Sequence, residues 1–209
     1  QNIVYRFSDL NSIKQIAARN LAIAILPRQL NQDSADRWQL KLLEIAETDG
    51  LTGFFNKISV ATQVRAYLET AVAGSLFMID IDDFKKVNDA HGHHIGDGAL
   101  ELVARLMREA FPGDFIVRLG GDEFLICLVG ERSLAFLEEK ANRLLQSLLE
   151  AFQVSDYLRV MSASIGIASS ADPGTKLDDL VRQSDIAMYA AKQSGKSRCC
   201  VYSSGLIKK

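Results

Sequence analysis

The chain has 209 residues, and its 24 Lys and Arg residues nearly balance 26 Asp and Glu residues, which gives a formal net charge of -2. Such a balance creates no overall field that would draw the protein to nucleic acid or to an anionic membrane, so any polyphosphate site must be built locally. With 48% hydrophobic residues, the chain can bury one full core and still form a further element. We therefore expect one domain with an extension.

The cysteine content and the apolar runs bear on the compartment. The three cysteines are an odd number, and their spacing fits neither a zinc site nor a disulfide framework. This favours a reducing cytoplasm. The longest apolar run near the start, residues 21–26, is far shorter than the roughly 20 residues that cross a bilayer, and no signal sequence precedes it. We expect a soluble chain without membrane contact, and its start at Gln1 suggests a piece of a longer protein.

Two helices are expected before residue 49. The first covers about residues 10–26 and ends before Pro27. The second, over 34–48, has apolar residues at alternating steps of three and four, namely Ala35, Trp38, Leu42 and Ile45. This seam favours equally a helix packed on its own domain and a dimeric coiled coil. We interpret residues 1–48 as a helical extension that ends an upstream regulatory region.

Two glycines in the segment 49–53 break the helical pattern and predict a turn, which we take as the start of a second unit over 49–209. Helices are expected there over about 56–71, 82–89, 96–110, 133–152 and 177–194, and strands over 76–79, 115–118, 124–129, 158–168 and 199–202. Strands joined by a tight turn run antiparallel, and the helices return the chain across the sheet. The pattern predicts an α+β fold of the ferredoxin-like or polymerase-palm type, with an antiparallel-rich sheet flanked by helices.

Carboxylates follow the first buried strand. Asp80, Asp82 and Asp83 stand at the end of that strand, with Lys85 one short helical turn later. Mg²⁺ prefers one or two carboxylates together with substrate phosphates, and a lysine adds a point charge for the same phosphates. An ordinary acidic helix start would give the same pattern. On these residues alone, both interpretations remain open.

A second acidic pair lies in the segment Gly120-Gly121-Asp122-Glu123, between two apolar strands. A Gly-Gly tip allows backbone to approach a ligand closely, because no Cβ is in the way. Gly and Asp are also the usual residues of a plain turn. If the hairpin lies beside the strand that ends at Asp80, Asp122 could complete a carboxylate site for metal.

Together these motifs resemble the GGDEF domain family. Residues 120–124 match that family's signature letter for letter, and Phe54 stands where the family usually has Leu. The other landmarks appear in order, as Asp49-Gly50-Leu51-Thr52-Gly53 with Asn56, Asp80-Ile81-Asp82 with Phe84-Lys85 and Asn88-Asp89, Gly92-His93 with Gly96-Asp97, and Ser184-Asp185-Ile186-Ala187-Met188-Tyr189 with Ala191-Lys192 and Gly195. The resemblance implies a diguanylate cyclase, which condenses two GTP molecules into cyclic di-GMP and two pyrophosphates with Mg²⁺ or Mn²⁺.

The resemblance implies a metal site and a base. Asp80 and Asp122 would hold the metal through their side chains, and Ile81 through its backbone carbonyl. Asp122 would also be the base for the attacking 3′-hydroxyl, a task that needs a carboxylate beside a metal-bound phosphate. Glu123 is placed with the catalytic and metal-binding residues, and a purely supporting role is its alternative.

The resemblance also implies the contacts with GTP. Lys85 and Lys192 would neutralise charge on the phosphates during transfer. Asn88 and Asp97 would read guanine, because a carboxylate accepts hydrogen bonds from the ring N1–H and the exocyclic amine, a pattern that adenine lacks. His93 would contact nucleotide or order its loop. The substrate-binding set is completed by Gly120, Gly121 and Lys196.

Lys196 departs from the family pattern, which usually has Arg after the glycine at Gly195. The lysine keeps the positive charge but lacks the planar guanidinium that can donate two parallel hydrogen bonds to phosphate. We expect weaker GTP binding without loss of activity.

Two GTP molecules are needed for one product, so the family logic implies a homodimer with facing sites and an upstream sensory domain that controls it. One alternative is a catalytically weak GGDEF module that binds nucleotide for regulation, against which the intact carboxylates and lysines argue. Another is a different palm-fold nucleotidyl transferase. The guanine-reading pair Asn88 and Asp97, and the lack of a basic groove for a nucleic-acid template, argue against it.

Many family members also have an Arg-x-x-Asp site before the signature, where product binds and arrests the enzyme. Here Asp114 holds the Asp position, but Phe111 holds the Arg position. Arg108 lies one helical turn earlier and is expected to be misdirected or solvated. We therefore expect no strong product inhibition through this site.

Overall fold

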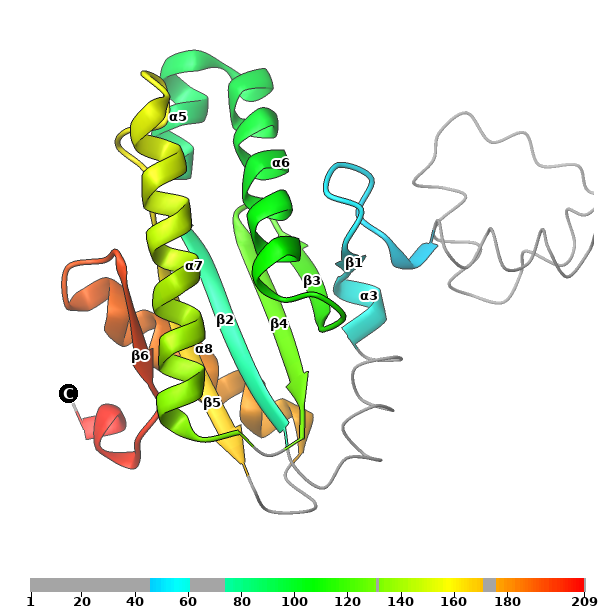
Figure 1. The fold of residues 1–209 in the computed structure, drawn as a ribbon, viewed down its shortest axis with the longest axis vertical. Helices are drawn as coiled ribbons and strands as arrows, with labels where there is room; N and C mark the ends of the chain where they lie inside the picture. The colour runs from blue at the N-terminus through cyan, green and yellow to red at the C-terminus, as the bar shows by residue number, and fades with distance from the viewer. Residues whose placement is uncertain (1–45, 61–73, 131, 171–175, 209) are drawn as a thin grey trace, which may run out of the picture.

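The computed structural model describes residues 46–60, 74–130, 132–170 and 176–208. The helix expected over 10–26, most of the one expected over 34–48 and most of the one expected over 56–71 lie outside these residues. Within them, six strands form one sheet in the order β1-β3-β4-β2-β5-β6 (Figure 1).

The sheet is mainly antiparallel, with a parallel strand at each edge. Its strands are β1 (Phe55–Asn56), β2 (Gly74–Asp82), β3 (Phe115–Gly120), β4 (Glu123–Val129), β5 (Ser162–Ser170) and β6 (Arg198–Val201). Strand β2 lies at the centre and pairs antiparallel with β4 and β5, while β1 and β6 run parallel to their neighbours β3 and β5. The expected antiparallel-rich sheet flanked by helices is confirmed.

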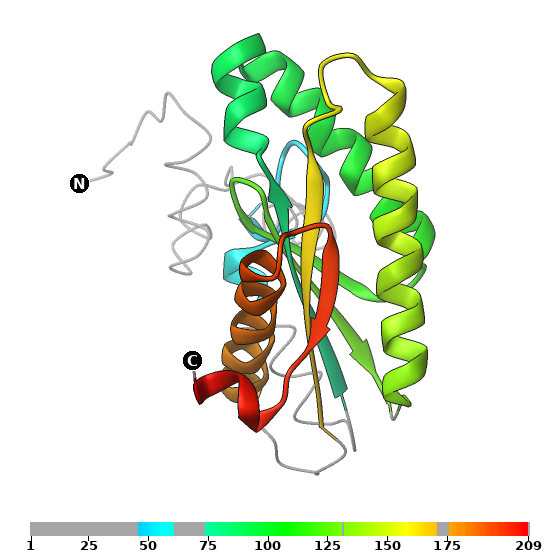
Figure 2. The same cartoon turned by 90° about the vertical axis from the view of Figure 1, so that its left-hand side faces the viewer.

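Besides the short α3 (Lys57–Ser59), the described residues form four helices, which flank the sheet. They are α5 (Phe84–His91), α6 (His93–Ala110), α7 (Leu134–Val154) and α8 (Leu177–Gln193), and a short 3-10 helix, η3 (Ser204–Lys208), follows β6. Ser133 caps α7, because its hydroxyl accepts a hydrogen bond from the N–H of Phe136. Figure 2 shows α8 on one face of the sheet and α6 with α7 on the other.

Side-chain alternation along β2 divides the core between these faces. Phe77, Ile79 and Ile81 belong to the larger core with α6 and α7, whereas Leu76 and Met78 pack in the smaller core with α8. Because successive strand residues point to opposite faces, the even-numbered Asp80 and Asp82 lie on the α8 face. The same alternation that buries the strand therefore brings its carboxylates to α8.

One glycine allows α8 to lie directly on the sheet. A Cβ on Gly166 of β5 would lie 2.0 Å from the carbonyl oxygen of Ser184 and 2.1 Å from the backbone nitrogen of Met188. Any side chain there would push the helix away from the strand. This close approach positions Lys192, one turn beyond Met188, over the end of the sheet.

Strands β2 and β5 differ most from the sequence expectation. Strand β2 covers 74–82 rather than 76–79, because the polar residues at both of its ends are also buried. Strand β5 begins at Ser162 rather than at 158. Residues 155–161 form turns instead, in which the N–H of Met161 donates to the carbonyl of Leu158 at 2.8 Å. The turn buries Leu158, so its apolar side chain reaches the core without a strand.

Among the residues that the structure describes, no helix has both the length and the apolar character needed to cross a bilayer.

Candidate active site

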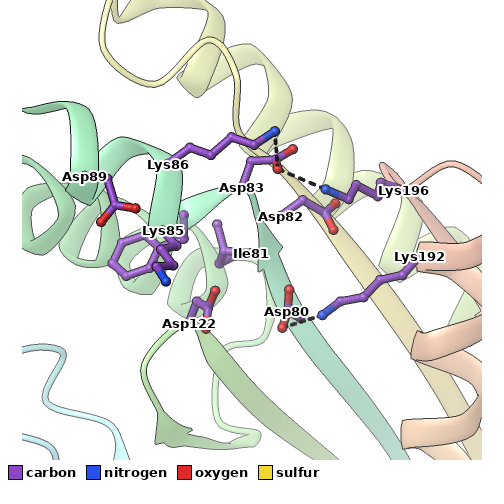
Figure 3. A pocket seen from close by; sticks show the side chains of 11 residues that line it. Asp80, Ile81, Asp82, Asp83, Lys85, Lys86, Asp89, Asp122, Lys192 and Lys196 are labelled. Atoms are coloured by element: carbon purple, nitrogen blue, oxygen red, sulfur yellow. Dashed lines mark hydrogen bonds and ion pairs between the residues drawn. The ribbon is translucent and has the colours of Figure 1, made fainter.

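A pocket of about 380 Å³ opens where β2 ends, beside the β3–β4 hairpin and the C-terminal end of α8. Its walls combine acidic and basic side chains from segments more than 100 residues apart. The residues that line the pocket are Asp80, Ile81, Asp82, Asp83, Phe84, Lys85, Lys86, Asp89, Asp122, Lys192 and Lys196. Figure 3 shows these side chains around the pocket.

Asp80 is the most constrained acid in this set. It is 8% exposed, and one of its carboxylate oxygens lies 2.7 Å from Nζ of Lys192 (Figure 3). Burial raises the pKa of Asp80, and the negative charges of Asp122 and Asp82 raise it further, while the hydrogen bond from Lys192 offsets part of this effect. A buried carboxylate that is repelled by two neighbouring acids is well suited to gain a cation.

The hairpin places Asp122 beside Ile81. The backbone N–H of Ile81 donates to the carbonyl of Asp122 at 3.1 Å. The glycines at the tip have positive φ angles of 150° for Gly120 and 55° for Gly121, and a Cβ at either position would meet no atom within 4 Å. The tip therefore leaves open space in which a ligand could approach the backbone.

The donor set fits a hard divalent cation. Asp80 and Asp122 supply two carboxylates, and Ile81 lies between them with a backbone carbonyl. In the described part of the chain, no group of three or more His, Cys, Asp or Glu side chains could hold a metal ion. Mg²⁺ commonly uses one or two carboxylates and takes its other ligands from phosphates and water. The pocket thus suits Mg²⁺ that arrives with a polyphosphate.

The basic side chains divide into two groups. Lys85 is exposed on the first turn of α5 and lines the pocket, while Lys192 is paired with Asp80. Lys196 pairs with Asp83, whose Oδ1 lies 3.0 Å from Nζ of Lys196 and 2.9 Å from Nζ of Lys86. The hydrogen bond that Lys196 donates to Asp83 raises the pKa of Lys196 above its ordinary value. Asp83, to which the sequence analysis gave no role of its own, thus holds a lysine at the rim.

The residues expected to read guanine lie on α5 and α6 and do not line this pocket. Oδ1 of Asn88 is buried and has no hydrogen-bond partner in the described part of the chain. It lies against Gly96, where a Cβ would be only 1.9 Å away. Asp97 follows Gly96 and is exposed, as is His93 at the start of α6. The structure therefore brings Asn88 close to the residue before Asp97, and leaves His93 at the surface.

Glu123 is not brought into the pocket. It is opposite Asp80 in the β2–β4 ladder, but its exposed side chain lines a neighbouring groove of about 590 Å³ together with Val181, Arg182 and Asp185 of α8. Of its two expected roles, this placement favours the supporting one over a place in the metal shell.

Two polar residues that the motif analysis did not assign are central to the site. Arg118 donates from Nε and Nη2 to the carbonyl of Gly121, at 3.0 and 2.8 Å. Asp82 is 2% exposed and accepts hydrogen bonds from Ser162 and Ser164, which are 80 or more positions away. Strand alternation could have placed Asp82 inside, but no sequence pattern identifies its partners.

The segment before the hairpin differs from an arginine-based ligand site. Phe111 is 1% exposed and packs edge-on against Phe77. Asp114 pairs with Lys140 at 3.3 Å. Arg108 lines the same pocket of about 410 Å³ as Phe111 and Asp114, but its guanidinium donates to the carbonyl of Thr52 at 3.0 Å and is therefore engaged within the chain.

Comparison with known proteins decides the family. Residues 46–198 match the family model described as "Diguanylate cyclase, GGDEF domain". The chain belongs to the GGDEF family. This confirms the resemblance that the motifs carry.

Relatives of this GGDEF domain include signalling proteins of several bacteria. The chain is 32% identical to the signaling protein YkoW of Bacillus subtilis over 218 residues, which cover 94% of the chain and 27% of YkoW. It is 33% identical over 178 residues to MucR of Pseudomonas aeruginosa, named a bifunctional diguanylate cyclase/cyclic di-GMP phosphodiesterase, and these cover 83% of the chain and 26% of MucR. The chain thus spans only about a quarter of the length of these relatives.

A solved structure shares the fold. It is that of the coiled coil and GGDEF domain of DgcB from Caulobacter crescentus in complex with c-di-GMP. The two superpose with a TM-score of 0.74 at 25% identity, over 81% of this chain and 92% of the DgcB chain.

Proposed function

We propose that this GGDEF domain is a diguanylate cyclase that condenses two GTP molecules into cyclic di-GMP and two pyrophosphates. The observation that carries the proposal is the pocket itself, in which the carboxylates of Asp80 and Asp122 lie with the ammonium groups of Lys85, Lys192 and Lys196. The match to the diguanylate cyclase family and the similarity to MucR support this activity.

The acidic residues would activate the nucleophile and hold the phosphates. Asp122 accepts the proton of the 3′-hydroxyl as its oxygen attacks the α-phosphate of the second GTP, and pyrophosphate leaves from that phosphorus. Bound by Asp80, Asp122 and the carbonyl of Ile81, Mg²⁺ would polarise the phosphate oxygens and offset negative charge. With Asp80 engaged in holding the metal ion, Lys192 would be free to pair with the triphosphate.

The lysines would stabilise charge that grows during transfer. Lys85, Lys192 and Lys196 border the pocket from α5, α8 and the turn after α8, so they can surround a triphosphate from separate elements. Positioned charges of this kind stabilise a phosphoryl-transfer transition state without taking part in covalent chemistry. Lys196 must exchange Asp83 for phosphate to do so.

Recognition of the base would fall to Asn88 and Asp97. Asn88 carries a buried carbonyl oxygen without a partner, and Asp97 offers an exposed carboxylate. A carboxylate matches the two donors on the guanine edge, whereas adenine offers no such pair. One pocket would hold one GTP, and a second copy of the domain would present the other GTP with its 3′-hydroxyl facing the first α-phosphate.

The decisive experiment is to incubate the purified chain with GTP and Mg²⁺, or Mn²⁺, and to separate the products by chromatography. We expect cyclic di-GMP and two equivalents of pyrophosphate, and a rate per chain that rises with protein concentration. Asp122→Asn serves as the inactive control, with its fold checked by circular dichroism. GTP binding without any product would instead indicate a regulatory module, and no GTP binding would refute the proposal.

A further inference from the structure

We propose that Asp82 is a positioning residue, which holds the turn after α8 so that Lys196 stands at the phosphate end of the pocket. This inference rests on the proposed function, because it assigns a role at the same site. Asp82 lines the pocket, but both of its carboxylate oxygens accept hydrogen bonds from within the chain.

Both carboxylate oxygens of Asp82 accept hydrogen bonds from other segments of the chain. Oδ2 accepts from the hydroxyl of Ser162 at 2.7 Å, and Oδ1 accepts from the hydroxyl of Ser164 at 2.9 Å. Oδ2 also accepts from the backbone N–H of Ser197 at 3.3 Å. A buried carboxylate that accepts from three donors is held in one orientation. Asp82 therefore joins β2 to β5 and to the turn between α8 and β6.

That turn has an unfavourable backbone. Gly195, Lys196 and Ser197 have φ angles of 109°, 62° and 50°. Residues other than glycine rarely adopt the left-handed region, because the Cβ approaches the following carbonyl oxygen. Two such residues in succession persist only where surrounding contacts impose the conformation. The hydrogen bond from Ser197 to Asp82 is such a contact.

The turn determines where the ammonium group of Lys196 lies. The N–H of Lys196 donates to the carbonyl of Ala191 at 3.1 Å, which closes the end of α8, and Asp82 holds the following residue on the sheet side. Between these two anchors the side chain of Lys196 extends into the pocket and reaches Asp83 at 3.0 Å (Figure 3). If the anchor on Ser197 were lost, the turn could relax to negative φ angles, and the lysine would leave the pocket.

Electrostatics alone predicts the opposite effect of removing this charge. Asp82 carries a negative charge near a site meant for polyphosphate, so neutralising it would strengthen binding of an anion. A positioning role predicts weaker binding instead. The sign of the change therefore distinguishes the two.

The test measures binding of 3′-deoxy-GTP, which lacks the attacking hydroxyl, and of guanosine monophosphate, both with Mg²⁺, by calorimetry. We expect Asp82→Asn to weaken 3′-deoxy-GTP about tenfold and to change guanosine monophosphate less than about twofold, because guanine recognition does not involve the turn. Lys196→Met should give a similar selective loss. In the double variant the losses should not add, because both act through one ammonium group.

Ser75→Ala is the matched control, because it removes a hydrogen bond of 2.9 Å between β2 and β5, to Ser169, at the opposite end of β2. It should leave both affinities unchanged. If Asp82→Asn does not fold, the pair Ser162→Ala and Ser164→Ala removes two donors from Asp82 and should show a smaller loss with the same selectivity. If the wild-type chain binds 3′-deoxy-GTP tightly, three results overturn the inference alone. These are additive losses of affinity in the double variant, equal losses for the two ligands in Asp82→Asn, and stronger binding in Asp82→Asn. Absent wild-type binding overturns the inference together with the proposed function.

Discussion

Nη1 of Arg118 lies 3.0 Å from Oδ1 of Asp49, so one guanidinium joins the turn at residues 49–53 to the Gly-Gly hairpin. The same side chain donates twice to the carbonyl of Gly121. Asp49 also accepts from the N–H and the hydroxyl of Thr52 at 2.9 and 2.8 Å. The first residue of the turn at 49–53 and the tip that carries Asp122 are therefore linked by a single arginine.

This link makes part of the stability dependent on pH. Burial raises the pKa of Asp49, but the hydrogen bonds from Thr52 and Arg118 outweigh it and hold the pKa below the ordinary value of 3.8. The charged form is thus favoured in the folded state, and its contribution is present above pH 3.8 and is lost as the pH falls through the lowered pKa. We predict that Asp49→Asn lowers the free energy of unfolding by about 1–2 kcal/mol at pH 7 and by less near pH 3.

Urea unfolding at both pH values would check this. Arg143→Gln is the control, because it removes an exposed ion pair with Glu139 within α7 and should change stability by less than about 0.5 kcal/mol at either pH. A loss for Asp49→Asn that is the same at both pH values would show that the carboxylate charge contributes nothing.

The carboxylate pair predicts a conflict between stability and activity. Burial raises the pKa of Asp80 and the charge of Asp122 raises it further, so ionised Asp80 destabilises the folded chain as the pH rises above the ordinary carboxyl pKa. At pH 7 without Mg²⁺, we expect Asp122→Asn to raise Tm by about 1–3 °C. The rise in Tm on adding Mg²⁺ should be smaller than in the wild-type chain. The rate of cyclic di-GMP formation should fall at least about 100-fold. Differential scanning calorimetry and product chromatography measure these effects. An Asp156→Asn control on the exposed turn after α7 should change none of them, and an unchanged Mg²⁺ response in Asp122→Asn would contradict the metal assignment.

Gly96→Ala should damage guanine recognition without damaging the helix. The new methyl group would lie 1.9 Å from Oδ1 of Asn88, which must move. We expect GTP affinity to fall about tenfold and the preference for GTP over ATP to narrow, as measured by competition. Gly98→Ala on the same helix is a close control, because a Cβ there meets nothing within 4 Å; it should keep the affinity and gain up to about 1 kcal/mol of stability. Equal affinities for the two variants would exclude Asn88 from the base site.

Asp83 competes with phosphate for Lys196. Its carboxylate is shared with Lys86, and the hydrogen bond from Lys86 is the main cause that lowers the pKa of Asp83. We predict that Asp83→Asn tightens GTP binding by about two- to fivefold, because it releases the rim lysine. Asn tolerates the left-handed backbone found at this position, where φ is 60°. Lys86→Met, which leaves the Asp83–Lys196 pair in place, should not tighten binding. Titration with GTP at low and at high salt would measure the affinity of both variants. Weaker binding in Asp83→Asn would show that the Asp83–Lys196 ion pair preorganises Lys196.

Among the described residues, the sequence predicts most of the elements and the two acidic clusters, because both depend on local patterns. The apolar run of β2 ends in Asp80, and two glycines mark the hairpin, so their meeting follows once the strands are neighbours. The partners of Asp82 could not be predicted in this way, because Ser162 and Ser164 become neighbours only through the register of β2 and β5. Glu123 shows the reverse case: its place in the motif suggests the metal site, while its side chain lies along α8.

The segment before the hairpin predicts how the proposed enzyme responds to its product. Product carries two phosphates and guanine faces, which an arginine can grip and stack on. Phe111 offers no donor and is buried, and Lys140 lies over its ring at 4.3 Å while pairing with Asp114. The guanidinium of Arg108 is committed to the carbonyl of Thr52 and to the ring of Phe54, 4.9 Å away. The charged groups near Asp114 are thus already paired within the chain.

We therefore predict no strong inhibition by cyclic di-GMP through this segment. The measurement adds cyclic di-GMP to the assay and follows pyrophosphate release, with the wild-type chain beside Asp114→Ala and with Asp156→Ala as a surface control. All three should keep their rates at low micromolar product, and any inhibition at higher concentration should be competitive with GTP and equal among them, because it would arise at the active site. Inhibition at low micromolar product that Asp114→Ala alone relieves would mean that Lys140 or Arg108 leaves its present partner to replace the missing arginine.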